Sequence, residues 1–308
     1  AGVIQRRGRV SQGTTVSDYF PVEQDYGYSV FSTVYHVEYN NKKLNIIDCP
    51  GSDDFVGAAI TAINVTDTAV ILLNGQYGPE VGTQNHFRYT EKLKKPVIFL
   101  VNQLDSEKCD YANVLERLKD IYGPKVVPVQ YPLNEGPEFN SLIDVLLMKK
   151  YSWKPEGGVP IIEDIPADMA DECEEWRGKM IELAAEQDDT LMEKYFEDPD
   201  SLSEEEIVAA IRKGTLNLDI VPMTCGSSFK NKGVQTLLDY VCMFLPSPLD
   251  TPSIVGTNPE TGEEEARMPS EEEKTAALAF KIATDPYVGR LTFFRVYSGT
   301  VDAGSYIY

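Results

Sequence analysis

The chain of 308 residues is long enough for about two domains. Hydrophobic residues make up 42% and charged residues 25%, which are ordinary proportions for a folded globular protein and exclude wholesale disorder. Asp and Glu number 49 against 28 Lys and Arg, a net charge of −21. This balance excludes the broad, nonspecific phosphate binding that clustered cations provide, so we expect no DNA partner.

Apolar runs and cysteines limit where the protein acts. The longest purely apolar runs, such as 69–73 and 97–101, are far too short to span a bilayer, so we expect no membrane partner. The five Cys are scattered, without a CxxC pair or a Cys/His metal spacing. This usage is typical of a reducing compartment, and the sequence predicts a cytoplasmic protein.

Apolar, β-branched runs alternate with helical stretches through most of the chain. Strands are expected at 31–39, 43–48, 69–74, 97–102 and 219–224, and helices at 82–93, 111–122 and 233–245. Asn40-Asn41 lies between the first two strands and predicts a hairpin turn. The alternation of strands and helices predicts an α/β fold with a mostly parallel sheet.

The segment 161–220 differs in character, because it contains 19 acidic side chains and only 5 basic ones. The run Ser203–Glu206 has the spacing of a capping box, which predicts the start of a helix there. Two interpretations remain open for this segment. It is either a solvated acidic pair of helices or a docking surface for a basic partner.

The last 60 residues change composition again. Residues 247–274 are rich in Pro, Glu, Thr and Gly and are interpreted as a linker. Strands are expected to resume at 276–284 and 289–298. Two or three strands do not make an independent β-domain, so we expect the chain to stop inside a second domain.

Three loops that carry polar groups each follow a predicted strand. Asp48-Cys49-Pro50-Gly51 can place a carboxylate near a magnesium ion and a glycine amide near a phosphate. Asn102-Gln103-Leu104-Asp105 can offer an amide and a carboxylate to a planar base, and a carboxylate that accepts two donors selects guanine. Gly226-Ser227-Ser228 can contact the same base. Ligands of open α/β sheets bind at the carboxyl ends of strands, where all three loops are expected.

With these loops in this order, the chain resembles the elongation factor G family of translational GTPases over nearly all of its length. The amino-acid sequences of the segments 226–235 and 277–298 closely resemble those of that family. The resemblance implies a P-loop-GTPase-like mostly parallel sheet with an acidic α/β insert, followed by the start of a β-barrel. It implies a GTPase-like domain at 1–246 with the insert at about 131–217, a linker at 247–274, and the barrel start at 275–308.

The resemblance also implies cofactors and partners. GTP or GDP and Mg²⁺ are the family's ligands, and the ribosome is its partner. The acidic block at 161–220 resembles the insert that contacts the stalk protein of the large ribosomal subunit. The implied nucleotide-binding residues are Asp48, Gly51, Asn102, Gln103, Asp105, Gly226, Ser227 and Ser228, and the implied metal ligands are Ser29 and Asp48.

This sequence departs from the family at four places. The phosphate loop GxxxxGK[ST] has no counterpart here, so we expect it upstream of Ala1. The first switch Arg-Gly-Ile-Thr reads Tyr26-Gly27-Tyr28-Ser29, which loses the cation and keeps a hydroxyl. In the family, the second switch reads DxPGH, and its His positions the attacking water. In this chain Ser52 stands in place of that His. The family's base-recognition motif reads NKxD. In this chain Gln103 replaces the Lys, so the Lys stem that packs over guanine is lost.

These departures predict no intact catalytic residue, weak guanine nucleotide and Mg²⁺ binding at best, and little hydrolysis, because losing a positioned acid/base group costs about 10²–10⁴ in rate. Three alternatives remain open: an active GTPase when full length, a non-catalytic interaction module for the ribosome or its stalk, and a related translational GTPase. A divergent paralogue and a mosaic chain are equally compatible with the sequence.

The strand that precedes the phosphate loop normally lies at the centre of this family's sheet. Without it, two neighbouring strands lose the partners of their backbone hydrogen-bonding groups. We therefore expect the segments 43–48 and 69–74 to pair abnormally or to be separated by a gap.

Overall fold

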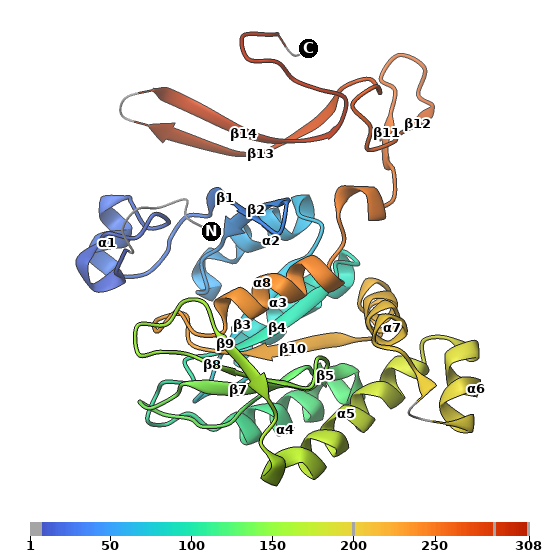
Figure 1. The fold of residues 1–308 in the computed structure, drawn as a ribbon. Coiled ribbons are helices and arrows are strands. Elements are labelled where there is room, and N and C mark those ends of the chain that lie inside the picture. Colours follow the sequence, from blue (N-terminus) through green and yellow to red (C-terminus); the bar gives the residue numbers. More distant parts are fainter. Residues whose placement is uncertain (1–7, 199–200, 286–287, 307–308) are drawn as a thin grey trace.

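A four-stranded parallel sheet forms the centre of the computed structural model, which describes residues 8–198, 201–285 and 288–306 (Figure 1). Its strands are β3 (Ala69–Asn74), β4 (Val97–Asn102), β5 (Val126–Pro128) and β10 (Val221–Cys225). They lie in the order β3-β4-β10-β5, and every neighbouring pair is parallel. The predicted α/β fold with a mostly parallel sheet is confirmed.

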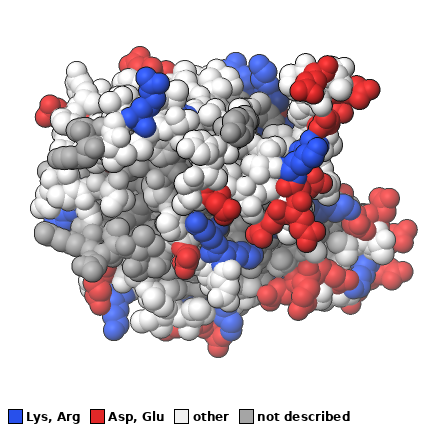
Figure 2. Space-filling view, turned by 90° about the horizontal axis from the view of Figure 1, so that it is seen from above, with Lys and Arg blue, Asp and Glu red and all other residues white. Residues whose placement is uncertain are grey.

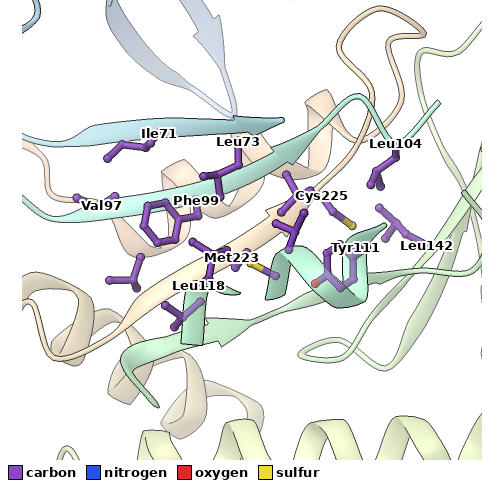
Figure 3. Close-up of a cluster of buried hydrophobic side chains, with 14 of the residues drawn as sticks. Ile71, Leu73, Val97, Phe99, Leu104, Tyr111, Leu118, Leu142, Met223 and Cys225 are labelled. Carbon is purple, nitrogen blue, oxygen red and sulfur yellow. The ribbon is translucent and has the colours of Figure 1, made fainter. Parts of the chain in front are cut away.

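Helices cover both faces of this sheet, and as a result β4 has no exposed residue along its length. Phe99 and Val101 point into a cluster with side chains of α3 (Val81–Lys92) and α4 (Tyr111–Tyr122). Ile98 points to the opposite face, where α7 (Glu204–Asn217) and α8 (Val234–Phe244) pack. Figure 3 shows the first cluster, in which Phe99 and Met223 of adjacent strands lie beside Leu118 of α4.

The element bounds agree closely with those expected from the sequence. The helix at 111–122 is found as predicted, and the other two differ by one residue at their ends. The strand expected at 219–224 begins and ends slightly later, as β10. Ser203 caps α7, since its side chain accepts from the amide of Glu206 at 3.2 Å while the Glu206 carboxylate accepts from the Ser203 amide at 2.9 Å.

A two-stranded hairpin stands apart from the main sheet. β1 (Thr33–Tyr39) and β2 (Lys42–Asp48) pair in antiparallel fashion from Thr33↔Asp48 to Tyr39↔Lys42. Asn40 and Asn41 both have a positive φ, at 47° and 57°, as the predicted two-residue turn requires. Within the described residues, β2 pairs only with β1, and β3 only with β4.

The expected gap between the segments 43–48 and 69–74 is therefore confirmed. A cavity of about 2280 Å³ occupies it, bounded by β2, β3, the two helices α2 (Val56–Val65) and α3, and part of α8. Leu72, in the middle of the apolar strand β3, is 56% exposed toward this space. Strands that are apolar along their whole length are normally buried on both faces, whereas the side chain of Leu72 remains open to the cavity.

Between β5 and β10 the chain builds a second, antiparallel sheet and three helices. The sheet has the order β6-β7-β8-β9, with bounds Gln130–Pro132, Ser141–Asp144, Lys149–Ser152 and Ile161–Asp164. The helices are α5 (Ala170–Ala185), α6 (Asp189–Glu197) and α7. Figure 2 shows acidic side chains gathered along one side of the molecule, the side on which α6 and the hairpin β11–β12 lie in Figure 1.

The C-terminal part adds two hairpins. β11 (Ile254–Thr257) pairs with β12 (Glu264–Arg267), so the segment interpreted as a linker contains regular structure that its Pro- and Gly-rich composition does not predict. β13 (Ala276–Asp285) pairs with β14 (Gly289–Ser298) where strands were expected. This hairpin docks on the first part of the chain, because Arg295 forms an ion pair of 2.7 Å with Asp67 and the Lys281 ammonium donates to the Ser32 carbonyl.

The remaining elements are short. They are η1 (Val10–Gln12), α1 (Pro21–Tyr26), η2 (Asp53–Phe55), η3 (Gly123–Lys125), η4 (Ala167–Met169) and η6 (Pro248–Asp250). In the described ranges, no helix combines the length and the apolar character that crossing a bilayer requires.

Candidate functional site

The loops that follow β4 and β10 meet at the carboxyl end of the sheet. The backbone amide and the hydroxyl of Ser228 both donate to the Oδ1 atom of Asn102, at 2.9 and 3.0 Å. The Ser227 hydroxyl donates to the Oδ1 atom of Asp105 at 2.6 Å. The structure thus brings together four of the residues that the sequence singled out, from two loops more than 120 positions apart.

Backbone contacts fix the relative position of these two loops. The Gly226 amide donates to the carbonyl of Val101 at 2.9 Å, and the Leu104 amide donates to the Gly226 carbonyl at 3.2 Å. Gly226 is sterically required, since a Cβ there would lie 2.6 Å from the Lys232 carbonyl oxygen. Leu104 is fully buried and anchors its loop in the core. Only small displacements of either loop are compatible with this packing.

Gln103 has a left-handed backbone, with φ at 64°, an uncommon conformation for a residue other than glycine. Its Oε1 atom accepts a hydrogen bond of 2.8 Å from the Nδ2 atom of Asn74, at the end of β3. Asn74 in turn accepts from the Gln76 amide at 2.8 Å. Gln103 therefore ties the loop after β4 to the neighbouring strand.

Asp48 is the last residue of β2, and Gly51 lies in the loop that follows it. The lining of the cavity includes Asp48, Gly51 and Ser52, and it continues to Asn102 and Gln103. One continuous space therefore joins the loop after β2 to the loop after β4.

Burial raises the pKa of the Asp48 carboxyl; the nearby carboxylates of Asp18 and Glu23 raise it further, and a hydrogen bond from Ser17 opposes them. Asp48 lines the cavity, and carboxylate oxygens are of the ligand type that Mg²⁺ binds in proteins. In the described part of the chain, no three His, Cys, Asp or Glu side chains gather as a cation site.

Ser29 is not joined to Asp48 in this structure. Its hydroxyl donates to the Oδ1 atom of Asp18 at 2.7 Å instead. The loop that carries Ser29 is held by Glu23, a buried carboxylate that accepts from the amides of Val30 and Phe31, both at 3.0 Å. The hydroxyl of Ser29 and the amides of Val30 and Phe31 are thus satisfied by two carboxylates of the same N-terminal part of the chain.

Ser52 occupies the N-cap position of η2. Its Oγ atom accepts from the amide of Asp54 at 3.4 Å, a weak capping contact. The hydroxyl is thereby oriented toward the helix that follows.

His86 is a residue that the sequence did not connect with this loop. The first turn of α3 lies against the loop after β2, because a Cβ at Gly82 would lie 3.5 Å from the Gly51 carbonyl oxygen. Burial lowers the pKa of His86, while the carboxylate of Asp53 opposes that shift. Its Nε2 atom is buried and has no hydrogen-bond partner among the described residues. In the sequence, the four-residue spacing from Gly82 to His86 places both residues on one face of the helix. That this helix meets the loop is seen in the structure, where Asn85 also donates to the Oδ1 atom of Asp53 at 3.4 Å.

Comparison with known proteins identifies the family of this chain. The elongation factor Tu GTP-binding domain family matches residues 1–247, and the chain belongs to this family. It is 43% identical to elongation factor G of Cytophaga hutchinsonii over 314 residues, an alignment that covers the whole chain and 45% of that protein. A crystal structure of a protein from Thermus thermophilus superposes with a TM-score of 0.83 at 28% identity, covering 97% of this chain and 42% of that one.

The chain is thus an elongation-factor-G-like translational GTPase domain and spans less than half the length of the curated relative that it matches. Membership implies in general that the domain binds GTP or GDP with Mg²⁺.

Proposed function

We propose that this chain is the guanine-nucleotide-binding portion of an elongation-factor-G-like ribosomal translocation factor that is defective in hydrolysis. The observation that carries the proposal is the pair of contacts Ser227–Asp105 and Ser228–Asn102. They hold a carboxylate and an amide at the end of a parallel sheet, where bases are bound. A carboxylate has about four acceptor sites, so Asp105 can accept from Ser227 and from two donors of guanine.

The hydrolysis defect follows from the loop after β2. Ser52 stands where the family has a histidine, and its oxygen faces the Asp54 amide. A hydroxyl cannot reach as far as an imidazole or share its charge, and the loss of such a group costs about 10²–10⁴ in rate. Gln103 further weakens base binding, because it is tied to Asn74 and lacks a lysine stem.

Magnesium would be held by Asp48, whose raised pKa reflects burial and a site rich in negative charge. The ion would neutralise the charge of the nucleotide phosphates. Ser29 would have to release Asp18 before it could serve as a second ligand, so we expect weak metal binding by this chain. Gly51 would allow close approach of the backbone to phosphate, since a Cβ there meets nothing within 4 Å.

The ribosome is the proposed partner, with cytoplasmic localisation. The acidic helices α5, α6 and α7 would face the stalk protein of the large subunit, since their exposed carboxylates suit a basic surface. The domain arrangement is proposed as 1–246, a linker at 247–274 and a barrel start at 275–308.

A single-turnover GTP assay on the full-length protein, with and without ribosomes, tests the proposal. We expect nucleotide binding with little release of phosphate in either condition. Strong stimulation of phosphate release by ribosomes would overturn the defect and favour the alternative of an active GTPase. His86 supports that alternative, because its buried Nε2 atom lies on the helix that packs against the loop of Ser52.

The second alternative is a non-catalytic interaction module with a vestigial pocket. Calorimetric titration with GDP separates it from nucleotide binding. Measurable affinity that is abolished in Asp105→Ala supports a working pocket. An absence of GDP binding by the full-length protein would leave only the interaction module.

A further inference from the structure

We infer that two loops of the insert, Gly136–Asn140 and Trp153–Gly158, form a supporting wall that positions the base loop (Gly226–Lys232) for recognition of guanine. The inference rests on the proposed function, because it concerns the same nucleotide site. It assigns to Gly157 and Lys232 the role of positioning residues that act through Ser227 on Asp105.

Gly157 packs directly on the backbone of the base loop. A Cβ at this position would overlap the carbonyl oxygen of Lys230 and lie 2.8 Å from that of Asn231. The next residue, Gly158, donates its amide to the Asn231 carbonyl at 2.8 Å. The indole nitrogen of Trp153 in turn donates to the Gly158 carbonyl at 3.0 Å, which holds the wall in place.

Lys232 fastens the opposite end of the base loop. It is only 6% exposed, and its ammonium donates to the Phe139 carbonyl of the insert at 2.6 Å. The backbones of Lys232 and Ser227 exchange two hydrogen bonds, at 2.8 and 3.0 Å. A shift of Lys232 therefore moves Ser227, and with it the hydroxyl that holds Asp105.

The loop after β4 is supported from the same side. The Gly136 amide donates to the Leu104 carbonyl at 2.8 Å, next to Asp105. The Glu135 carboxylate accepts from the amide of Tyr111 at 3.1 Å, at the start of α4. Both loops that would read the base are thus fixed by the insert, which is continuous with the acidic helices in the chain.

The supporting wall would affect how well the site distinguishes guanine, which has a 2-amino group, from a base that lacks it. An anchored Asp105 can accept from two neighbouring donors of guanine at once, whereas inosine offers only one of them. A displaced base loop frees the carboxylate to rotate, and the bond to the 2-amino group is then lost more readily than overall stacking. A purely structural defect would weaken binding of both nucleotides equally.

The test measures dissociation constants of GDP and inosine diphosphate by calorimetry on full-length Gly157→Ala. Gly262→Ala is the matched control, because Gly262 also has a positive φ, at 72°, but lies in the β11–β12 hairpin, where a Cβ meets nothing within 4 Å. We expect GDP affinity to fall about tenfold or more in Gly157→Ala, the range of one lost bond to a charged group, with a smaller loss for inosine diphosphate. The control is expected to keep the wild-type ratio.

Trp153→Phe provides a second variant if Gly157→Ala fails to fold, since it removes the indole donor and keeps an aromatic ring in this buried position. Its GDP preference is expected to fall a few-fold. A wild-type preference for GDP that persists in every folded variant overturns the positioning role and leaves the proposed function intact. A wild type that binds neither nucleotide overturns both.

Discussion

The Ser227 hydroxyl donates a hydrogen bond of 2.6 Å to the carboxylate of Asp105, joining two loops whose residues are 122 positions apart. Ser227 is 1% exposed, so water does not compete for this bond. The contact orients one oxygen of the carboxylate. It makes the geometry of the proposed guanine site depend on a side chain that itself need not touch the nucleotide.

Ser227→Ala is expected to weaken GDP binding about tenfold, because the half-buried carboxylate of Asp105 loses a charge-assisted donor. Ser228→Ala is the matched control. It removes one hydroxyl donor to Asn102, but the backbone amide of Ser228 still donates to the same oxygen at 2.9 Å, so the loss should be smaller. Calorimetric titration checks both. Equal affinities for the two variants would contradict the anchoring role of Ser227.

Ser52→His is expected to increase ribosome-stimulated GTP hydrolysis by the full-length protein. An imidazole can position the attacking water, and such groups contribute about 10²–10⁴ in rate. The measurement is single-turnover phosphate release. His86→Ala, assayed alongside, is expected to leave the low wild-type rate unchanged. A drop in wild-type turnover on removal of His86 would show instead that this imidazole already acts in hydrolysis.

Asp144→Asn is expected to alter the pH dependence of stability. Asp144 is fully buried, and burial raises the pKa of its carboxyl from 3.8 to about 6, although the Tyr240 hydroxyl donates to it at 2.6 Å. Between these values the folded state binds a proton that the unfolded state has released, so stability falls as pH rises from about 4 to 6. The full effect corresponds to about 3 kcal/mol.

Urea unfolding at pH 4.5 and 7 checks this behaviour. The free energy of unfolding of Asp144→Asn, relative to wild type, should increase with pH across this window. Tyr240→Phe serves as a companion, because removing the donor raises the pKa of Asp144 further and moves the fall to higher pH. A pH-independent difference between Asp144→Asn and wild type would refute the assignment.

Glu23→Ala is expected to loosen the segment 20–31. The buried carboxylate accepts from three backbone amides, those of Phe20, Val30 and Phe31. Each amide left unpaired in a buried position costs about 1–3 kcal/mol. Amide hydrogen exchange should therefore accelerate in this segment more than in β4.

The exposed carboxylate of Glu91 provides the control for that experiment. It pairs with Lys125 at 2.7 Å and is 47% exposed, so Glu91→Ala should cost less than about 1 kcal/mol. Unchanged exchange across 20–31 in Glu23→Ala would mean that the aromatic contacts of Phe20 and Phe31, with ring centroids 5.1 Å apart, hold the segment without the carboxylate.

Local patterns determined much of this molecule. The apolar runs of β3 and β4, the Asn40-Asn41 turn and the Ser203 cap were predictable because each depends on neighbours within a few positions of the chain. The polar loops after the strands were predictable for the same reason. The strands of β11–β12 were missed, since the segment 247–274 that contains them is rich in Pro, Glu, Thr and Gly, a composition typical of linkers.

Only the tertiary structure decided which of these groups meet. The bonds Ser227–Asp105 and Lys232–Phe139, and the packing of the His86 helix on the loop of Ser52, join segments far apart in the chain. Such contacts arise when separate elements dock, and their orientation depends on sheet order and close packing rather than on sequence periodicity. The amino-acid sequence by itself thus specified the elements and the chemistry of their loops, while docking of those elements fixed how the loops work together.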